Sequence, residues 1–173
     1  TRPPRLAVTD SKVFARAAQD VPPCVPLTSF SILFARYKGN LAALARGAGR
    51  LSRLRTGDRV LIAEGCTHHR QCGDIGSVLM PGWIERYAGA RPCFDFASGG
   101  DFPRDLSGVS LVLHCGGCML NEREMQRRIG EAEAAGAPIV NYGMAIAQMH
   151  GVLRRSLELF PDVLKLMEEE RAG

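Results

Sequence analysis

The sequence predicts an α/β protein whose mostly parallel sheet is flanked by helices, with a small α/β segment at the N-terminal end. Short apolar runs of strand length recur in the second part of the chain, at residues 59–63, 93–97, 109–113 and 138–140. Segments with helical character separate these runs, and glycine or proline marks the turns. Strands that alternate with helices are typical of a parallel sheet, because the crossover helix returns the chain to the edge where the strand began.

Residues 1–57 are expected to form the small N-terminal segment. Its predicted elements, in order, are a strand near 6–8, a helix at 11–19, a proline-broken connection at 21–26 and a long amphipathic helix at 29–54. Three glycines weaken the long helix, since each costs roughly 1 kcal/mol relative to alanine in a helix interior. We expect any break in it near Gly47.

Residues 58–173 are expected to form the main domain, because a Thr-Gly-Asp turn at 56–58 precedes the first buried strand. Helices are predicted at 121–135, 144–159 and 161–170, and a short one carries the core residues Trp83 and Tyr87. The helix at 121–135 has the clearest start, since Asn121 is a good N-cap and Glu124 stands at the capping-box position.

Composition and charge exclude several classes of protein. With 173 residues, 46% of them hydrophobic, the chain can bury a core without disulfides. Six unevenly placed cysteines, no signal peptide and no long apolar run predict a cytoplasmic protein that does not enter a membrane. The net charge of +4 comes from the first 57 residues, which hold ten Lys or Arg and two acidic residues. The arginines at 46–55 are spread along a predicted helix with no aromatic residue between them, so we expect no nucleic-acid partner.

Two short motifs carry most of the chemical information. Cys66-Thr67-His68 follows the apolar run at 59–63, and His114-Cys115-Gly116-Gly117-Cys118 follows the run at 109–113. Ligands of open α/β sheets gather at the carboxyl ends of strands, so two neighbouring strand ends would bring these thiols and imidazoles together. We therefore predict a metal site. Gly116 and Gly117 permit a tight turn between thiolates, and the following helix directs its positive end toward them.

The spacing alone leaves the metal open. Cys66, His68, Cys115 and Cys118 match a Cys3His structural zinc site, but an iron–sulfur cluster or a thiol redox pair fits the same residues. His114 is either a direct ligand or a hydrogen-bond donor that supports the ligands. Two histidines beside three cysteines favour a site with one exchangeable position.

Four separated segments, at 28–39, 64–69, 114–121 and 138–143, resemble in order the FeFe-hydrogenase maturation GTPase family HydF. The resemblance implies that Cys66, Cys115 and Cys118 hold a 4Fe-4S cluster, with His68 or His114 as an exchangeable ligand of the fourth iron. It also implies a scaffold and carrier that accepts a two-iron precursor from radical-SAM maturases and delivers it to the FeFe-hydrogenase apo-enzyme. The resemblance further implies that the protein is a homodimer.

The chain departs from that family in having no G-x-x-x-x-G-K-[ST] phosphate loop. We therefore expect a non-enzymatic scaffold, with GTP involved only through a domain outside this sequence. The start at Thr1 indicates a piece of a longer polypeptide, in which residues 1–57 are the end of a dimerisation domain and 58–173 the iron–sulfur domain. A zinc-stabilised α/β interaction module is the alternative.

Overall fold

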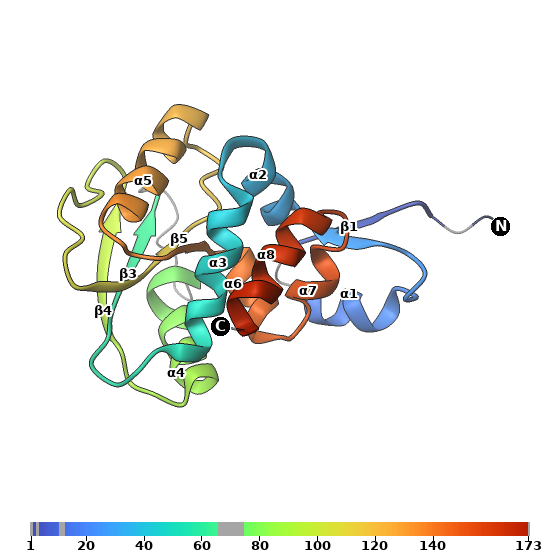
Figure 1. Ribbon diagram of the computed structural model, residues 1–173, viewed down its shortest axis with the longest axis horizontal. Coiled ribbons are helices and arrows are strands. Elements are labelled where there is room, and N and C mark those ends of the chain that lie inside the picture. Colours follow the sequence, from blue (N-terminus) through green and yellow to red (C-terminus); the bar gives the residue numbers. More distant parts are fainter. Residues whose placement is uncertain (1, 3, 11–12, 66–74, 173) are drawn as a thin grey trace.

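The computed structural model describes residues 2, 4–10, 13–65 and 75–172. Within them the chain forms two parallel sheets and a group of central helices, and the N-terminal strand and helix lie on the far side of those helices from the larger sheet (Figure 1). The predicted fold class, a parallel α/β sheet flanked by helices, is confirmed.

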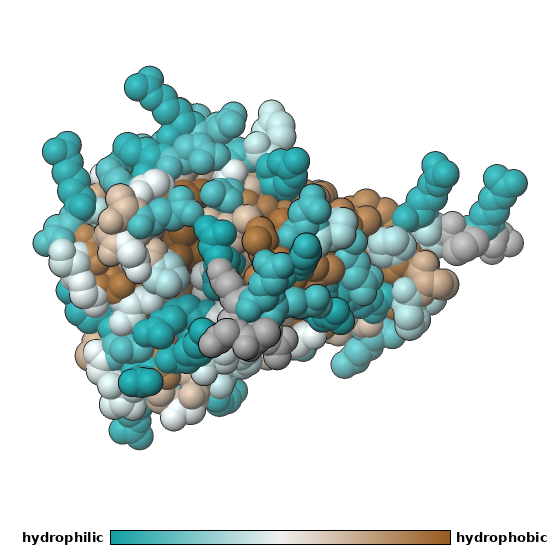
Figure 2. All heavy atoms as spheres, viewed as in Figure 1, coloured by the Kyte–Doolittle hydropathy of each residue, from teal (hydrophilic) through white to brown (hydrophobic). Residues whose placement is uncertain are grey.

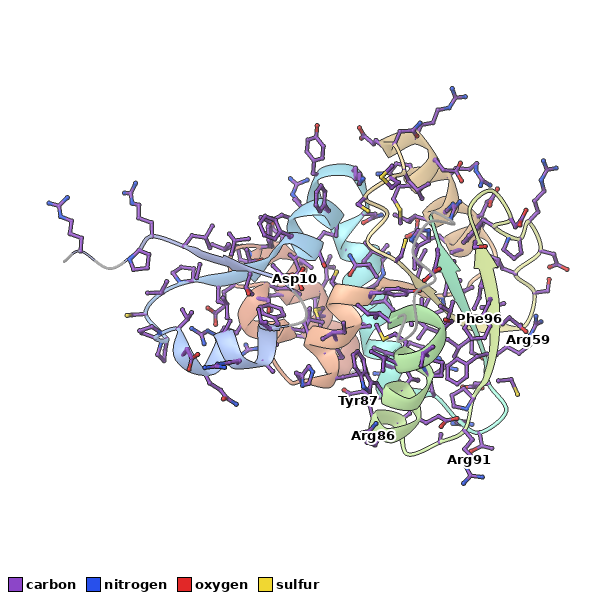
Figure 3. The ribbon with its side chains drawn as sticks, turned by 180° about the vertical axis from the view of Figure 1, so that it is seen from behind. Asp10, Arg59, Arg86, Tyr87, Arg91 and Phe96 are labelled. Carbon is purple, nitrogen blue, oxygen red and sulfur yellow. The ribbon has the colours of Figure 1, made fainter. Side chains whose placement is uncertain are left out.

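The larger sheet has four strands, all parallel, in the order β4-β3-β5-β6. Its strands are β3 (Arg59–Glu64), β4 (Cys93–Ser98), β5 (Val109–His114) and β6 (Ile139–Asn141). All four lie where the apolar runs predict them. The central strands β3 and β5 are almost entirely buried, whereas the edge strand β4 is largely exposed. Figure 3 shows Phe96 of β4 and Arg59 of β3 at this outer side of the sheet.

Helical elements follow and connect these strands. They are the π-helical turn η3 (Ile75–Leu79), α4 (Met80–Ala88), α5 (Glu122–Ala134), α6 (Tyr142–Met149), α7 (Leu153–Ser156) and α8 (Pro161–Ala172). The prediction of one helix over 144–159 is wrong, because the chain leaves α6 at His150 and turns at Gly151, whose φ is 71°. The predicted core position of Tyr87 is confirmed: it is partly buried, and its hydroxyl accepts a hydrogen bond from Gln148 of α6.

The N-terminal segment contains β1 (Ala7–Thr9), α1 (Phe14–Asp20) and β2 (Leu27–Ser29), and the two strands pair in parallel. Strand β2 was not expected. The predicted long helix is wrong as a single element, since it divides into α2 (Phe30–Lys38), α3 (Leu41–Arg50) and the 3-10 turn η2 (Leu51–Arg53).

The break falls at Gly39 and not at Gly47. Asn40 starts the new helix by accepting a hydrogen bond from the amide of Ala43, at 3.1 Å. Gly47 instead lies inside α3 against strand β6, where an added Cβ would stand only 1.9 Å from the carbonyl oxygen of Ile139. Its glycine therefore serves close packing of a helix on a strand.

The core is continuous from the N-terminal helices to the sheet. Arg155 of α7 also fastens the N-terminal segment, because its guanidinium donates to the carbonyls of Ala18, Val21 and Pro22. The outer surface is mostly hydrophilic, with hydrophobic residues visible near the start of α8, beside α2 (Figure 2). Among the described residues, no helix has both the length and the apolar character needed to cross a membrane.

Candidate functional site: a cysteine loop at the carboxyl edge of the sheet

The two cysteine motifs follow strands that are direct neighbours. In the pairing of β3 with β5, Ala63 lies opposite His114, and the amide of Cys115 donates to the carbonyl of Ala63 at 2.8 Å. The amide of Gly65 in turn lies 3.0 Å from the Cys115 sulfur. The prediction that the two strands preceding the motifs are neighbours is confirmed. Cys66 and His68 themselves lie outside the described residues.

The Cys115 sulfur accepts hydrogen bonds from two backbone amides. Besides Gly65, the amide of Gly117 donates to it at 3.4 Å, and the side chain is half-buried. Amide donors favour the charged thiolate over the neutral thiol, which is the form that binds metal. They are also one of the features by which proteins tune iron–sulfur clusters. Cys118, three residues further on, is exposed.

Residues 115–121, the cysteine loop, curl tightly because of Gly117. Its φ is 62°, in the left-handed region, and a Cβ there would approach the Met125 sulfur to 3.1 Å. The amide of Leu120 closes the turn by donating to the Gly117 carbonyl at 3.0 Å. Asn121 then caps α5 by accepting from the amide of Glu124 at 2.9 Å, as predicted. The loop thus leads directly into the positive end of a 13-residue helix.

His114 is fully buried at the end of β5 and makes hydrogen bonds through both ring nitrogens. Nε2 lies 3.0 Å from the Arg128 guanidinium, which can only donate, so Nε2 accepts. Nδ1 therefore carries the proton and donates to the Cys115 carbonyl at 2.7 Å. Burial lowers the pKa of His114 to about 4, so the ring is neutral at pH 7. These contacts favour the supporting role for His114 over direct ligation.

Arg128 of α5 holds three strand ends together and was not singled out from the sequence. Only 1% of it is exposed, and its guanidinium stacks over Phe102 at 5.0 Å. Besides His114 at the end of β5, it reaches the carbonyls of Glu64, at the end of β3, and Gly99, just after β4. Glu124, one helical turn earlier, accepts from it at 2.8 Å. The arginine thus ties the helix to the edge where the cysteines lie.

Lys38, at the end of α2, is the second buried cation of this site and was not singled out either. Its ammonium reaches the cysteine loop and donates to the carbonyls of Gly117 at 2.6 Å, Leu120 at 2.9 Å and Cys118 at 3.3 Å. Both cations occupy apolar helix faces, Lys38 three residues after buried Ala35 and Arg128 between buried Met125 and Ile129. A charge on an apolar helical stripe is the one sequence signal that could have found them.

The donor chemistry at this edge fits a thiolate-bound metal group, since Cys115 has amide donors and Cys118 shares its loop. In the part of the chain that the structure describes, no group of three or more His, Cys, Asp or Glu side chains is arranged to hold a metal ion. Two of the five predicted ligands fall outside that part. A hollow of about 720 Å³ between α3, α4 and α5 lies away from the cysteine loop.

Fold and site together define a parallel α/β protein with a cysteine loop at the carboxyl edge of its sheet. The family model of the hydrogen maturase F tetramerization domain matches residues 42–159, and that of the hydrogen maturase F dimerization domain matches residues 1–39. The chain belongs to the hydrogen maturase F family, as its four sequence segments indicated. None of the curated proteins matches it. Both matched domains are named for self-association, and membership of the family indicates a role in hydrogenase maturation.

Proposed function

We propose that this chain is an iron–sulfur scaffold that binds a 4Fe-4S cluster with one exchangeable position and delivers a two-iron precursor to FeFe-hydrogenase. The observation that carries the proposal is the Cys115 sulfur, which accepts amide hydrogen bonds from its own loop and from Gly65, the residue before Cys66. Membership of the hydrogen maturase F family supports the hydrogenase target.

Cys66, Cys115 and Cys118 are the proposed ligands. Three thiolates leave one iron of a 4Fe-4S cluster without a cysteine, and that iron supplies an exchangeable attachment point. His68 is our candidate for its weak ligand, because His114 already uses both ring nitrogens for hydrogen bonds to Arg128 and Cys115. His114, in this proposal, keeps the Cys115 backbone in place.

The proposed partners are radical-SAM maturases, which supply the two-iron precursor, and the apo-hydrogenase, which receives it. Self-association is part of the proposal, because both matched domains of the family are named for it. The chain itself acts as a scaffold and not as an enzyme, and GTP acts only through a domain outside residues 1–173.

Serine substitutions of single cysteines test the ligand set. After anaerobic reconstitution, we expect each of three variants to lose most of the bound iron and sulfide: Cys66→Ser, Cys115→Ser and Cys118→Ser. The EPR signal of each variant, recorded after chemical reduction, should be weaker or broader than that of the wild type. Cys93→Ser is the matched control, since Cys93 is exposed at the opposite end of the sheet, at the start of β4. Equal cluster content in the Cys115 and Cys93 variants would contradict the proposal.

His68→Ala tests the exchangeable position. We expect this variant to keep its iron and sulfide but to change its EPR signal, because only the fourth iron loses a ligand. The zinc-stabilised module predicts otherwise: a colourless protein that holds zinc through the same cysteines and unfolds when a chelator removes it.

A further inference from the structure

Lys38 is a buried cation whose hydrogen-bond partners all belong to a segment distant in sequence. Its side chain is 8% exposed, and the three ammonium protons are matched by the carbonyls of Gly117, Cys118 and Leu120. The ammonium also lies 5.2 Å from the centre of the Phe34 ring. Among the described residues, these contacts include carbonyl dipoles and an aromatic face but no carboxylate, and they stabilise the positive charge of Lys38.

Two further contacts fix α2 against the main domain, and so fix where Lys38 reaches. At the end of α2, the Gly39 carbonyl accepts from the side chain of Gln126 in α5, at 2.9 Å. At its beginning, the Ser31 carbonyl accepts from the side chain of Asn141, the last residue of β6, at 3.1 Å. These two contacts hold α2 in place against α5 and β6, and so hold Lys38 in place against the cysteine loop.

The three accepting carbonyls point inward from one tight turn. Three carbonyl oxygens that converge repel one another electrostatically, and a cation at their focus relieves this repulsion. Gly117 can adopt its left-handed φ of 62° at little cost, but glycine also adopts other conformations readily. The hydrogen bonds from Lys38 favour this one, because they bring the three carbonyls together.

We propose that Lys38 is a positioning residue for the cysteine loop: it fixes the curl that carries Cys115 and Cys118, and it places one positive charge at the carbonyls of Gly117 and Cys118. This proposal rests on the proposed function, since it names the residue that prepares the cysteine loop for a cluster. The positive charge stabilises the more reduced and therefore more negative cluster, so it raises the reduction potential.

Lys38→Met and Arg36→Met form the test pair. Each removes one positive charge from α2 and leaves an unbranched side chain, but Arg36 is exposed. Two readouts are needed, one without metal and one with the cluster. The first is amide hydrogen exchange of residues 115–121 in the metal-free full chain. The second is the midpoint potential of the reconstituted cluster.

We expect Lys38→Met to speed exchange of the Gly117 and Leu120 amides at least tenfold and to shift the midpoint potential to a more negative value. Arg36→Met should change neither. Lys38→Arg keeps the charge and is expected to restore the potential in part. Unchanged exchange in metal-free Lys38→Met would overturn the positioning role, and an unchanged potential would overturn the role of its charge. A wild-type chain that binds no cluster would defeat the proposed function, while the exchange experiment would still decide whether Lys38 holds the loop.

Discussion

The carboxyl edge of the sheet and the contact between α3 and β6 are organised by different interactions. At the edge, the buried cations Lys38 and Arg128 donate to backbone carbonyls of distant segments, and Arg128 also donates to the buried ring of His114. Where α3 meets β6, the buried residues are small or apolar, and the helix approaches the strand through Gly47. The first region fixes the shape of a loop, whereas the second fixes only the distance between two elements.

This difference has an energetic consequence. The contact between α3 and β6 depends on close packing, so a larger side chain there destabilises the whole fold. The edge depends on matched donors and acceptors, so loss of one donor leaves several carbonyls or a ring nitrogen unsatisfied. Three sets of substitutions separate the two regions.

Gly47→Ala is expected to have the largest effect. The new Cβ would stand 1.9 Å from the Ile139 carbonyl oxygen, a backbone atom that cannot move without displacing β6. We expect a loss of about 4 kcal/mol in the free energy of unfolding, measured by urea denaturation. Gly49→Ala is the matched control on the same helix, since its Cβ would meet no atom within 4 Å. It should stabilise the protein by about 0.5–1 kcal/mol. Equal effects at both positions would contradict the close packing of α3 on β6.

Arg128→Met should cost less, about 3 kcal/mol, because it removes donors from His114, Gly99 and Glu64 but keeps most of the buried aliphatic volume. Its neighbour Arg127 makes ion pairs with Glu124 and Glu131 at a more exposed position. Arg127→Met is therefore expected to cost less than about 1 kcal/mol. Chemical denaturation of both variants measures the difference, and a larger loss for Arg127→Met would show that the buried network is not what stabilises this edge.

The smallest effects are expected at two helix caps, one in each region. Asn121→Ala and Asn40→Ala each remove one side-chain acceptor at the start of α5 or α3 and should each cost about 1 kcal/mol. Only Asn121→Ala should also speed hydrogen exchange in residues 115–121, because its helix begins where the cysteine loop ends. Faster exchange of that loop in Asn40→Ala would mean that the two regions are not separate.

The sequence pattern predicted those features that depend on local order. Strands β3 and β5 are continuous apolar runs, and their adjacency at the cysteine motifs follows from the general behaviour of parallel sheets. The Asn121 cap could be predicted because residue and partner are three positions apart. Strand β2 was missed because it is only three residues long and gains its partner from β1, twenty positions earlier.

The missed helix breaks have the same origin. Apolar spacing continues through Gly39, but a new helix begins after Asn40. Asn40 has the extended backbone of an N-cap, and its side chain accepts from the amide of Ala43. Lys38 and Arg128 could not be assigned to the site from their neighbours, because the carbonyls that receive their hydrogen bonds lie up to 82 positions away along the chain. The cysteines were visible from spacing, whereas the residues that position them were not.

The central claim is that the cysteine loop belongs to an iron–sulfur scaffold of the hydrogen maturase F family. Its most direct test is the metal content of the full chain, purified and reconstituted without oxygen, together with EPR of the reduced protein. We predict iron and sulfide in equal amounts, enough for one 4Fe-4S cluster per chain, and the EPR signal of a reduced cluster. Stoichiometric zinc with no cluster signal would contradict the claim.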